Sequence, residues 1–272
     1  MGAIRLTHPF PSILDGLVVG AVAGLAGADP RNAVLLGLAM TALQLGIGAV
    51  NDVVDAPRDA GHKPGKPIPA GLVPVRLAVL MAAIAFTTGV GLAAAGGPME
   101  VGLAIVVIGI GLAYDLRLKG TAWSWLPFAI GIPLLPVFGW VGATGGLSPM
   151  FVVLIPAAVA GGAALAIANG LVDVGRDGSA GVTSVAIALG EGRAQMIGIV
   201  LLAGIAVAAA GSAFVLGRGA PVVTTVGLIG CLPIAAASLA RPSDPTRREN
   251  AWRAEAVGLG LLTVAWIQLV AR

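Results

Sequence analysis

Long apolar runs alternate with short polar segments along the whole chain. Each run has about 15 to 24 residues, close to the length that an α-helix needs to cross the hydrocarbon layer of a membrane. Strands with unpaired edges are excluded from lipid, so the runs predict helices. We expect an all-α, polytopic membrane protein, a bundle of about nine transmembrane helices around a central cavity. The predicted spans are 12–28, 33–54, 74–95, 100–114, 123–141, 150–173, 195–216, 222–240 and 252–271.

The composition supports a membrane protein. Of the 272 residues, 57% are hydrophobic, and the mean hydropathy is +0.97, whereas soluble domains are about 45–50% apolar. The 41 glycines suit helices that pack closely in lipid through small residues. Cys231 is the one cysteine, so no disulfide forms within the chain. The sequence shows no soluble domain or linker, and we expect a single transmembrane domain over residues 1–272.

The first span has a second interpretation. Arg5, an apolar core and the small residues at 26–28 resemble a signal peptide. Because many further spans follow, we interpret this span as a retained helix. Asp15 lies inside it and is either a polar group near the helix end or a residue that faces a cavity, as ionisable groups within spans often do.

The basic residues are divided unequally between the two sides of the membrane. Of the 16 Lys and Arg residues, only Arg31, Arg218 and Arg272 fall on one side of the predicted spans. The positive-inside rule therefore places the N-terminus and the even-numbered loops in the cytoplasm. This bias accounts for the net charge of +3 without a nucleic-acid partner. We expect a multi-pass protein of the cell membrane whose cavity opens to the cytoplasmic side.

The densest polar cluster follows directly on the second span. Asn51, Asp55 and Asp59 are spaced i, i+4 and i+8, which places them on one face of a helix. Oxygen donors in a row suit a hard cation such as Mg²⁺. Pro57 should kink or end the helix nearby. Asp52 is expected to point off the shared face, and its role, at the helix end or behind the metal ligands, stays open.

The same spacing recurs 118 residues later, in Asn169, Asp173 and Asp177. Glycines at 175 and 178 should loosen the helix at this point. Like the first motif, this one lies at the end of a predicted span and on the side predicted to be cytoplasmic. Two such motifs facing one cavity would form a polynuclear cation site able to bind a diphosphate.

Three sequence elements occur in a fixed order. The first reads Asn51-Asp52-x-x-Asp55-x-x-x-Asp59 and is followed by Lys66-Pro67-Ile68-Pro69-Ala70-Gly71. The next is Tyr114-Asp115-Leu116-Arg117-Leu118-Lys119, and the last is Asp173-x-x-x-Asp177-x-x-x-Gly181, with Thr183 and Leu189-Gly190 downstream. In order and spacing, over nearly the whole chain, these elements resemble those of the UbiA superfamily of intramembrane prenyltransferases.

The resemblance implies Mg²⁺-dependent transfer of a prenyl group from a polyprenyl diphosphate to a small acceptor. An aromatic acceptor is expected, such as a hydroxybenzoate or another quinone-precursor-like ring. The Asn and Asp residues of both motifs would hold the metal, namely Asn51, Asp55, Asp59, Asn169, Asp173 and Asp177. Basic residues would bind the diphosphate, namely Arg58, Lys66, Arg117 and Lys119, and Tyr114 with Lys119 would be catalytic. The acceptor, the prenyl chain length and the oligomeric state stay open.

Three alternatives remain at this point. Some members of the superfamily cyclise the prenyl chain without an acceptor, and the sequence does not separate the two reactions. A transporter or ion channel would carry acidic residues within its spans, whereas here they lie at span ends. Acidic residues that only balance loop cations would be scattered, whereas five of the 13 fall in the two motifs.

Overall fold

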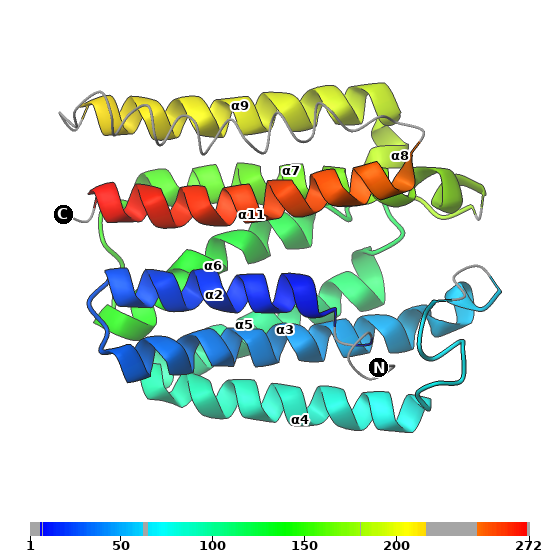
Figure 1. Cartoon of the computed structure of the whole chain (residues 1–272), viewed down its shortest axis with the longest axis horizontal. Coiled ribbons are helices and arrows are strands. Elements are labelled where there is room, and N and C mark those ends of the chain that lie inside the picture. The colour runs from blue at the N-terminus through cyan, green and yellow to red at the C-terminus, as the bar shows by residue number, and fades with distance from the viewer. Residues whose placement is uncertain (1–5, 7, 62–64, 180, 216–243, 271–272) are drawn as a thin grey trace. The chain divides into compact units, whose positions relative to one another are not determined.

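The computed structural model describes residues 6, 8–61, 65–179, 181–215 and 244–270, apart from the side chains at 176, 177, 179 and 213. Within these ranges the regular elements are helices and no strand is found (Figure 1). The helices are α2 (Pro9–Leu25), α3 (Pro30–Asp59), α4 (Val75–Ala93), α5 (Pro98–Ala113), α6 (Leu126–Thr144), α7 (Phe151–Ser179), α8 (Val185–Leu189), α9 (Glu191–Val215) and α11 (Pro245–Val270). A 3₁₀ turn, η1 (Ala94–Gly96), follows α4, and a π-helical turn, η2 (Tyr114–Leu118), follows α5.

Seven of these helices are long and apolar enough to cross a membrane, and the 17-residue α2 is a shorter apolar helix. The prediction of an all-α, multi-pass membrane protein is confirmed. Eight of the predicted spans correspond to a described helix, and the span predicted at 222–240 lies outside the described residues. The short helix α8 was not predicted, because five residues carry too little periodicity to be recognised.

Local sequence explains where several helices begin. Prolines occupy the first turn of α2, α3 and α5, where the missing N–H group has no partner to lose. The side chain of Asp29 caps α3, because its carboxylate accepts hydrogen bonds from the backbone N–H groups of Arg31 and Asn32 at 3.0 and 3.1 Å. These signals fix the start of the helix that carries the first acidic motif.

The described chain divides into two compact units. The first comprises Met1–Leu116 and Leu134–Leu147, and the second comprises Arg117–Pro133 and Ser148–Arg272. The last part of α6 belongs to the first unit and its beginning to the second. The expectation of one domain over the whole chain therefore stays a prediction.

Within the first unit, glycines bring α2 and α3 close together. A Cβ added to Gly16 would lie 2.6 Å from the carbonyl oxygen of Gly37, and one added to Gly37 would lie 2.8 Å from that of Gly16. The two backbones approach this closely because neither position has a side chain. On the other side of α3, the ring of Phe86 from α4 fills the space beside Gly46. This packing holds α3 between α2 and α4.

The second unit is built around α7, which contacts α8, α9 and α11. A Cβ added to Gly162 of α7 would lie 2.9 Å from the Cα of Ala129, so α7 packs directly on the backbone at the start of α6. The hydroxyl of Ser124 accepts a hydrogen bond from the backbone N–H of Val185 at 3.0 Å. That bond fixes α8, which follows the second acidic motif in the chain.

Candidate active site

The first acidic motif lies in the last turns of α3. The helix continues through Pro57 and ends at Asp59, two residues later. Asp55 and Asp59 are buried, at 6% and 5% exposure, and Asn51 is half-buried. The expectation that the helix ends or kinks near the proline holds only in part, because Asp59 still belongs to the helix.

Asp52 is as buried as the two predicted carboxylate ligands on α3. It was expected to point off the face shared by the metal ligands, but it is 2% exposed and as buried as Asp55 and Asp59. These three positions are spaced i, i+3 and i+7, which is the regular pattern of a single helix face. The i, i+4, i+8 series that begins at Asn51 rotates gradually around the helix. The buried acidic stripe of α3 is therefore Asp52, Asp55 and Asp59.

Asn51 connects the first motif to the third element. Its amide Nδ2 donates a hydrogen bond to Asp115 Oδ1 at 2.6 Å. Asp115 is buried and lies in the π-helical turn η2, and π-turns inside helices are frequent at functional sites. Sequence reasoning gave Asp115 no role, although it stands inside the motif with Tyr114 and Lys119. The structure adds Asp115 to the candidate site.

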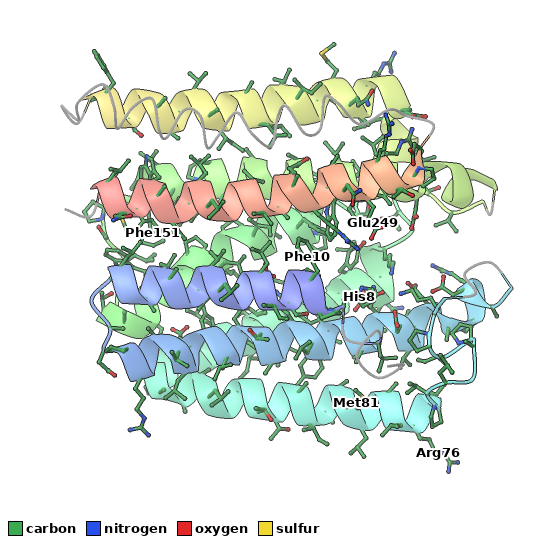
Figure 2. All side chains as sticks on the ribbon, viewed as in Figure 1. His8, Phe10, Arg76, Met81, Phe151 and Glu249 are labelled. Atoms are coloured by element: carbon green, nitrogen blue, oxygen red, sulfur yellow. The ribbon has the colours of Figure 1, made fainter. Side chains whose placement is uncertain are left out.

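Asp52 on α3 forms a second polar cluster, with Lys66 and His8. Asp52 Oδ1 accepts a hydrogen bond from Lys66 Nζ and contacts His8 Nε2 at 2.9 Å, and Lys66 Nζ lies 3.3 Å from the same histidine nitrogen. His8 precedes α2 (Figure 2) and has a left-handed backbone, with φ 46° and ψ 62°. The sequence predicted that Lys66 binds the diphosphate, and this stays a prediction. In the structure the ammonium of Lys66 contacts both Asp52 and His8.

The residues predicted to bind the diphosphate or to be catalytic differ in their exposure to solvent. Arg58 and Arg117 are exposed, whereas Tyr114 and Lys119 are half-buried. An Arg side chain can bind phosphate oxygens through a planar pair of N–H groups, and the predicted role of these two in diphosphate binding stays a prediction. The division between the two units falls after Leu116, so Tyr114 belongs to the first unit and Lys119 to the second.

The second acidic motif lies near the end of α7. The helix continues past Gly175 and Gly178 to Ser179, so neither glycine breaks it. Asn169 and Asp173 are half-buried, and the side chain of Asp177 lies outside the described residues. The motif is therefore helical throughout, although the glycines were expected to loosen the helix here.

Arg248 of α11 connects the last turns of α7 to the start of α9 through hydrogen bonds. Its Nη1 donates a hydrogen bond to the carbonyl oxygen of Leu171 at 2.7 Å, and its Nη2 donates to Glu191 Oε1 at the start of α9. Arg248 is 9% exposed, and Leu171 precedes Asp173 by two residues. The sequence analysis gave Arg248 no role, since no motif marks it.

The donor set determines which metal these residues suit. Among the described residues, no group of three or more His, Cys, Asp or Glu side chains is placed to hold a metal ion. Mg²⁺ does not need such a group, since it is usually bound by one or two carboxylates together with substrate phosphates and water. The buried carboxylates of Asp55 and Asp59, with the amide of Asn51, are hard oxygen donors of this kind.

Comparisons with known proteins identify the family of this chain. Residues 15–259 match the model of the UbiA prenyltransferase family. The chain is 32% identical over 196 residues to the digeranylgeranylglyceryl phosphate synthase of Methanopyrus kandleri, covering 71% of this chain and 70% of that protein. A second enzyme of that name, from Methanoregula boonei, is 28% identical over 203 residues, which are 72% of this chain and 71% of the relative.

Solved structures show the same fold. A UbiA homolog from Archaeoglobus fulgidus, bound to GPP and Mg²⁺, superposes with a TM-score of 0.72 at 18% identity, covering 97% of this chain and 99% of that one. The apo structure of a UbiA homolog from Aeropyrum pernix K1 gives a TM-score of 0.72 at 21% identity, with 94% and 98% covered. The family match extends over both acidic motifs and the element between them. The chain belongs to the UbiA prenyltransferase family and is a multi-pass membrane prenyltransferase.

Proposed function

We propose that this prenyltransferase moves a prenyl group from a polyprenyl diphosphate to a small acceptor, with Mg²⁺ as its cofactor. The observation that carries the proposal is the pair of buried carboxylates, Asp55 and Asp59, at the end of the 30-residue helix α3. Acidic groups buried in a membrane protein are costly and mark ion or substrate sites. The A. fulgidus homolog bound to GPP and Mg²⁺ has the same fold and supports this assignment.

The two motifs supply the metal ligands in this proposal, namely Asn51, Asp55, Asp59, Asn169, Asp173 and Asp177. Their oxygen donors have the chemistry that Mg²⁺ requires. Bound there, Mg²⁺ would neutralise the charge that develops on the departing diphosphate. Asp115 would hold Asn51 through the 2.6 Å hydrogen bond and so fix the orientation of its amide.

The basic residues bind the diphosphate oxygens. Arg58 and Arg117 are exposed and supply planar guanidinium groups. Lys119 is half-buried and supplies a compact charge close to Tyr114 in the chain. Tyr114 and Lys119 are proposed to contact the reacting end of the prenyl chain. Lys66 contributes charge to the same region, partly balanced by Asp52.

Two acceptor classes remain. An aromatic ring was expected from the family resemblance, since electron-rich rings attack an allylic cation. The M. kandleri and M. boonei relatives carry the name digeranylgeranylglyceryl phosphate synthase, which favours a glyceryl phosphate lipid whose hydroxyl is prenylated. We propose the glyceryl phosphate class first and the aromatic class second, and both are to be assayed side by side.

The experiment uses the full chain in nanodiscs with labelled geranylgeranyl diphosphate and each acceptor in turn. Asp55→Asn and Asp173→Asn should each reduce diphosphate release and product formation by about a hundredfold, the size of effect seen when one charge-stabilising group is removed. EDTA should abolish both signals and Mg²⁺ should restore them. Glu249→Gln is the matched control, since the Glu249 side chain is 47% exposed.

Undiminished turnover in both Asp variants would overturn the assignment of the site. If diphosphate is released without any acceptor and a cyclic hydrocarbon is formed, the reaction is cyclisation and not transfer. Ion flux through liposomes without diphosphate release would instead favour a transporter. Each result is read from the same purified protein.

The active site is proposed to open to the cytoplasm, with the N-terminus on the same side. The bias of Lys and Arg toward one set of loops supports this orientation. A single cysteine placed by Leu72→Cys, in a Cys231→Ser background, tests it, because Leu72 is 63% exposed in the loop after the first motif. An impermeant maleimide should label this cysteine in inverted vesicles and not in intact cells, and the opposite result would reverse the topology.

A further inference from the structure

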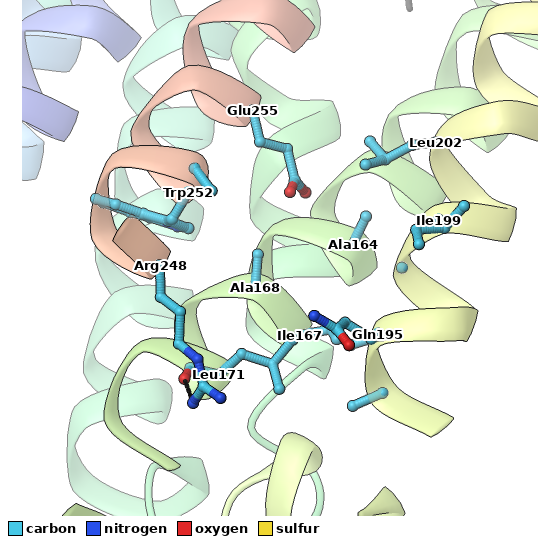
Figure 3. A pocket seen from close by; sticks show the side chains of 13 residues that line it. Ala164, Ile167, Ala168, Leu171, Gln195, Ile199, Leu202, Arg248, Trp252 and Glu255 are labelled. Carbon is cyan, nitrogen blue, oxygen red and sulfur yellow. Dashed lines mark hydrogen bonds between the residues drawn. The ribbon is translucent and has the colours of Figure 1, made fainter. Parts of the chain in front are cut away.

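A pocket lies within the second unit, between α7, α9 and α11. It contains about 510 Å³ of empty space, including its open mouth. Small residues make room for it, since Ala164 and Ala168 of α7 and Gly198 of α9 all belong to its lining. Ile199 and Leu202 complete the wall on α9 (Figure 3). The lining is mainly apolar and suits a hydrocarbon chain.

One buried carboxyl group faces this apolar space. Glu255 projects from α11 toward the gap between α7 and α9 (Figure 3) and is 2% exposed. Its Oε1 atom is buried, and no hydrogen-bond partner for it is found among the described residues. A buried polar atom without a partner is unfavourable. The position therefore calls for a group that donates a hydrogen bond.

Arg248, seven residues before Glu255 on α11, does not supply that hydrogen-bond donor. Arg248 also lines the pocket, but it donates to Leu171 and Glu191. Gln195 on α9 is the other polar residue of the lining apart from Trp252, and no hydrogen bond from it to Glu255 is found in the described part of the chain. Within the described part of the chain, Oε1 of Glu255 has no partner and can therefore accept a hydrogen bond from a molecule that enters the pocket.

We propose that this pocket binds a lipid that carries a hydroxyl group, such as a long-chain alcohol, with the hydroxyl donating to Glu255. The apolar walls take the hydrocarbon chain, and the hydroxyl satisfies the buried oxygen. An ammonium group would lose its hydration on entering the membrane interior, which a neutral hydroxyl avoids. The six proposed metal ligands do not line this pocket, although Leu171, between Asn169 and Asp173, does.

The test uses the fluorescence of Trp252, which lines the pocket, in full-length protein in nanodiscs. A brominated long-chain alcohol and a brominated alkane of equal length are titrated as quenchers. The alcohol should bind about tenfold more tightly than the alkane, as expected for one hydrogen bond to a buried carboxyl. Trp252→Phe should remove the saturable quenching, which shows that the signal comes from this pocket.

Glu255→Met, which keeps the volume and removes the polar atoms, should abolish the preference for alcohol while alkane quenching persists. Glu249→Gln, on an exposed part of the same helix, should leave the preference unchanged. Gly198→Leu should fill the pocket and abolish quenching by both probes. Gly198→Ala is its folding control, because the nearest atom to an added Cβ is Ile167 Cγ2 at 3.9 Å. Equal affinity for alcohol and alkane in the unmodified protein would overturn the proposal.

Discussion

The amide of Asn51 donates a 2.6 Å hydrogen bond to the carboxylate of Asp115, 64 residues later in the chain. The bond joins the end of α3 to the π-helical turn η2, so two of the three sequence motifs meet through it. A hydrogen bond to a charged acceptor contributes about 1.5–3 kcal/mol. Asn51 is therefore held in one orientation beside Asp55.

Replacing Asp115 should separate the structural and metal-binding effects of this bond. Asp115→Leu should lower the free energy of unfolding by about 2 kcal/mol and raise the Mg²⁺ concentration for half-maximal activity several-fold. Asp115→Asn still accepts from Asn51, so it should recover stability but not the Mg²⁺ response. Thermal unfolding and Mg²⁺ titration of activity measure the two effects. Leu116→Ala, at an exposed neighbour, is the control, and an unchanged Mg²⁺ response in both Asp115 variants would contradict the assignment.

The pairing of Lys66 with Asp52 predicts a loss of stability when either is removed alone. Asp52 is 2% exposed and the Lys66 side chain is 21% exposed, so Lys66→Met leaves a buried carboxylate with only His8 beside it. Breaking a buried pair costs about 3–5 kcal/mol. Adding Asp52→Leu to Lys66→Met should recover part of that loss. Arg76→Met, at an exposed basic residue, should be neutral, and equal stability of all variants in a urea titration would refute the prediction.

Arg248 should affect the activity through the second motif. Arg248→Met removes the donor to the carbonyl of Leu171, two residues before Asp173, so the Mg²⁺ requirement should rise several-fold and kcat should fall more than KM changes. Arg248→Lys retains one donor and should recover part of kcat. The adjacent Arg247, whose side chain is 60% exposed, gives the control variant Arg247→Met. A loss of activity of equal size in Arg247→Met would show that Arg248 has no special role.

Substitutions of two glycines on α2, Gly16 and Gly24, should have opposite effects on stability. Gly16→Val places a side chain against the carbonyl oxygen of Gly37, where an added Cβ already lies at 2.6 Å, and should destabilise the protein by about 1–3 kcal/mol. Gly24→Ala meets nothing within 4 Å and should stabilise the helix by about 0.5–1 kcal/mol. The melting temperatures of the two variants should therefore move in opposite directions. Similar melting temperatures would mean that α2 and α3 are not closely packed.

The spans were predictable because length and hydropathy alone determine them. The span predicted at 100–114 extends from Pro98 to Leu118 in the structure, because the charged residues after Tyr114 remain helical. The lengths of α3 and α7 were underestimated, because Asp and Gly residues lower hydropathy without ending a helix. A polar residue at the end of a span remains helical when its neighbours bury it.

The roles of the motif residues were only partly predictable. The i, i+4 spacing identified Asp55 and Asp59, both of which are buried on α3. It did not predict that Asp52 is equally buried, although helical geometry also groups i, i+3 and i+7. The contacts of His8 and Arg248 were not foreseeable, because each joins segments that are distant in the sequence, at separations of 44 and 77 residues.

The length of α3 has a consequence for how the reaction is supplied. Its 30 residues extend about 45 Å at 1.5 Å per residue, whereas the hydrocarbon layer is about 30 Å thick. The final turns, with their carboxylates, thus reach the headgroup region, where ions arrive by diffusion from bulk water. An isoprenoid donor reaches the same point by two-dimensional diffusion in the bilayer. Liberated pyrophosphate is diluted into the water while the prenylated product keeps its hydrocarbon chain in the bilayer, so partition between the two phases favours product formation.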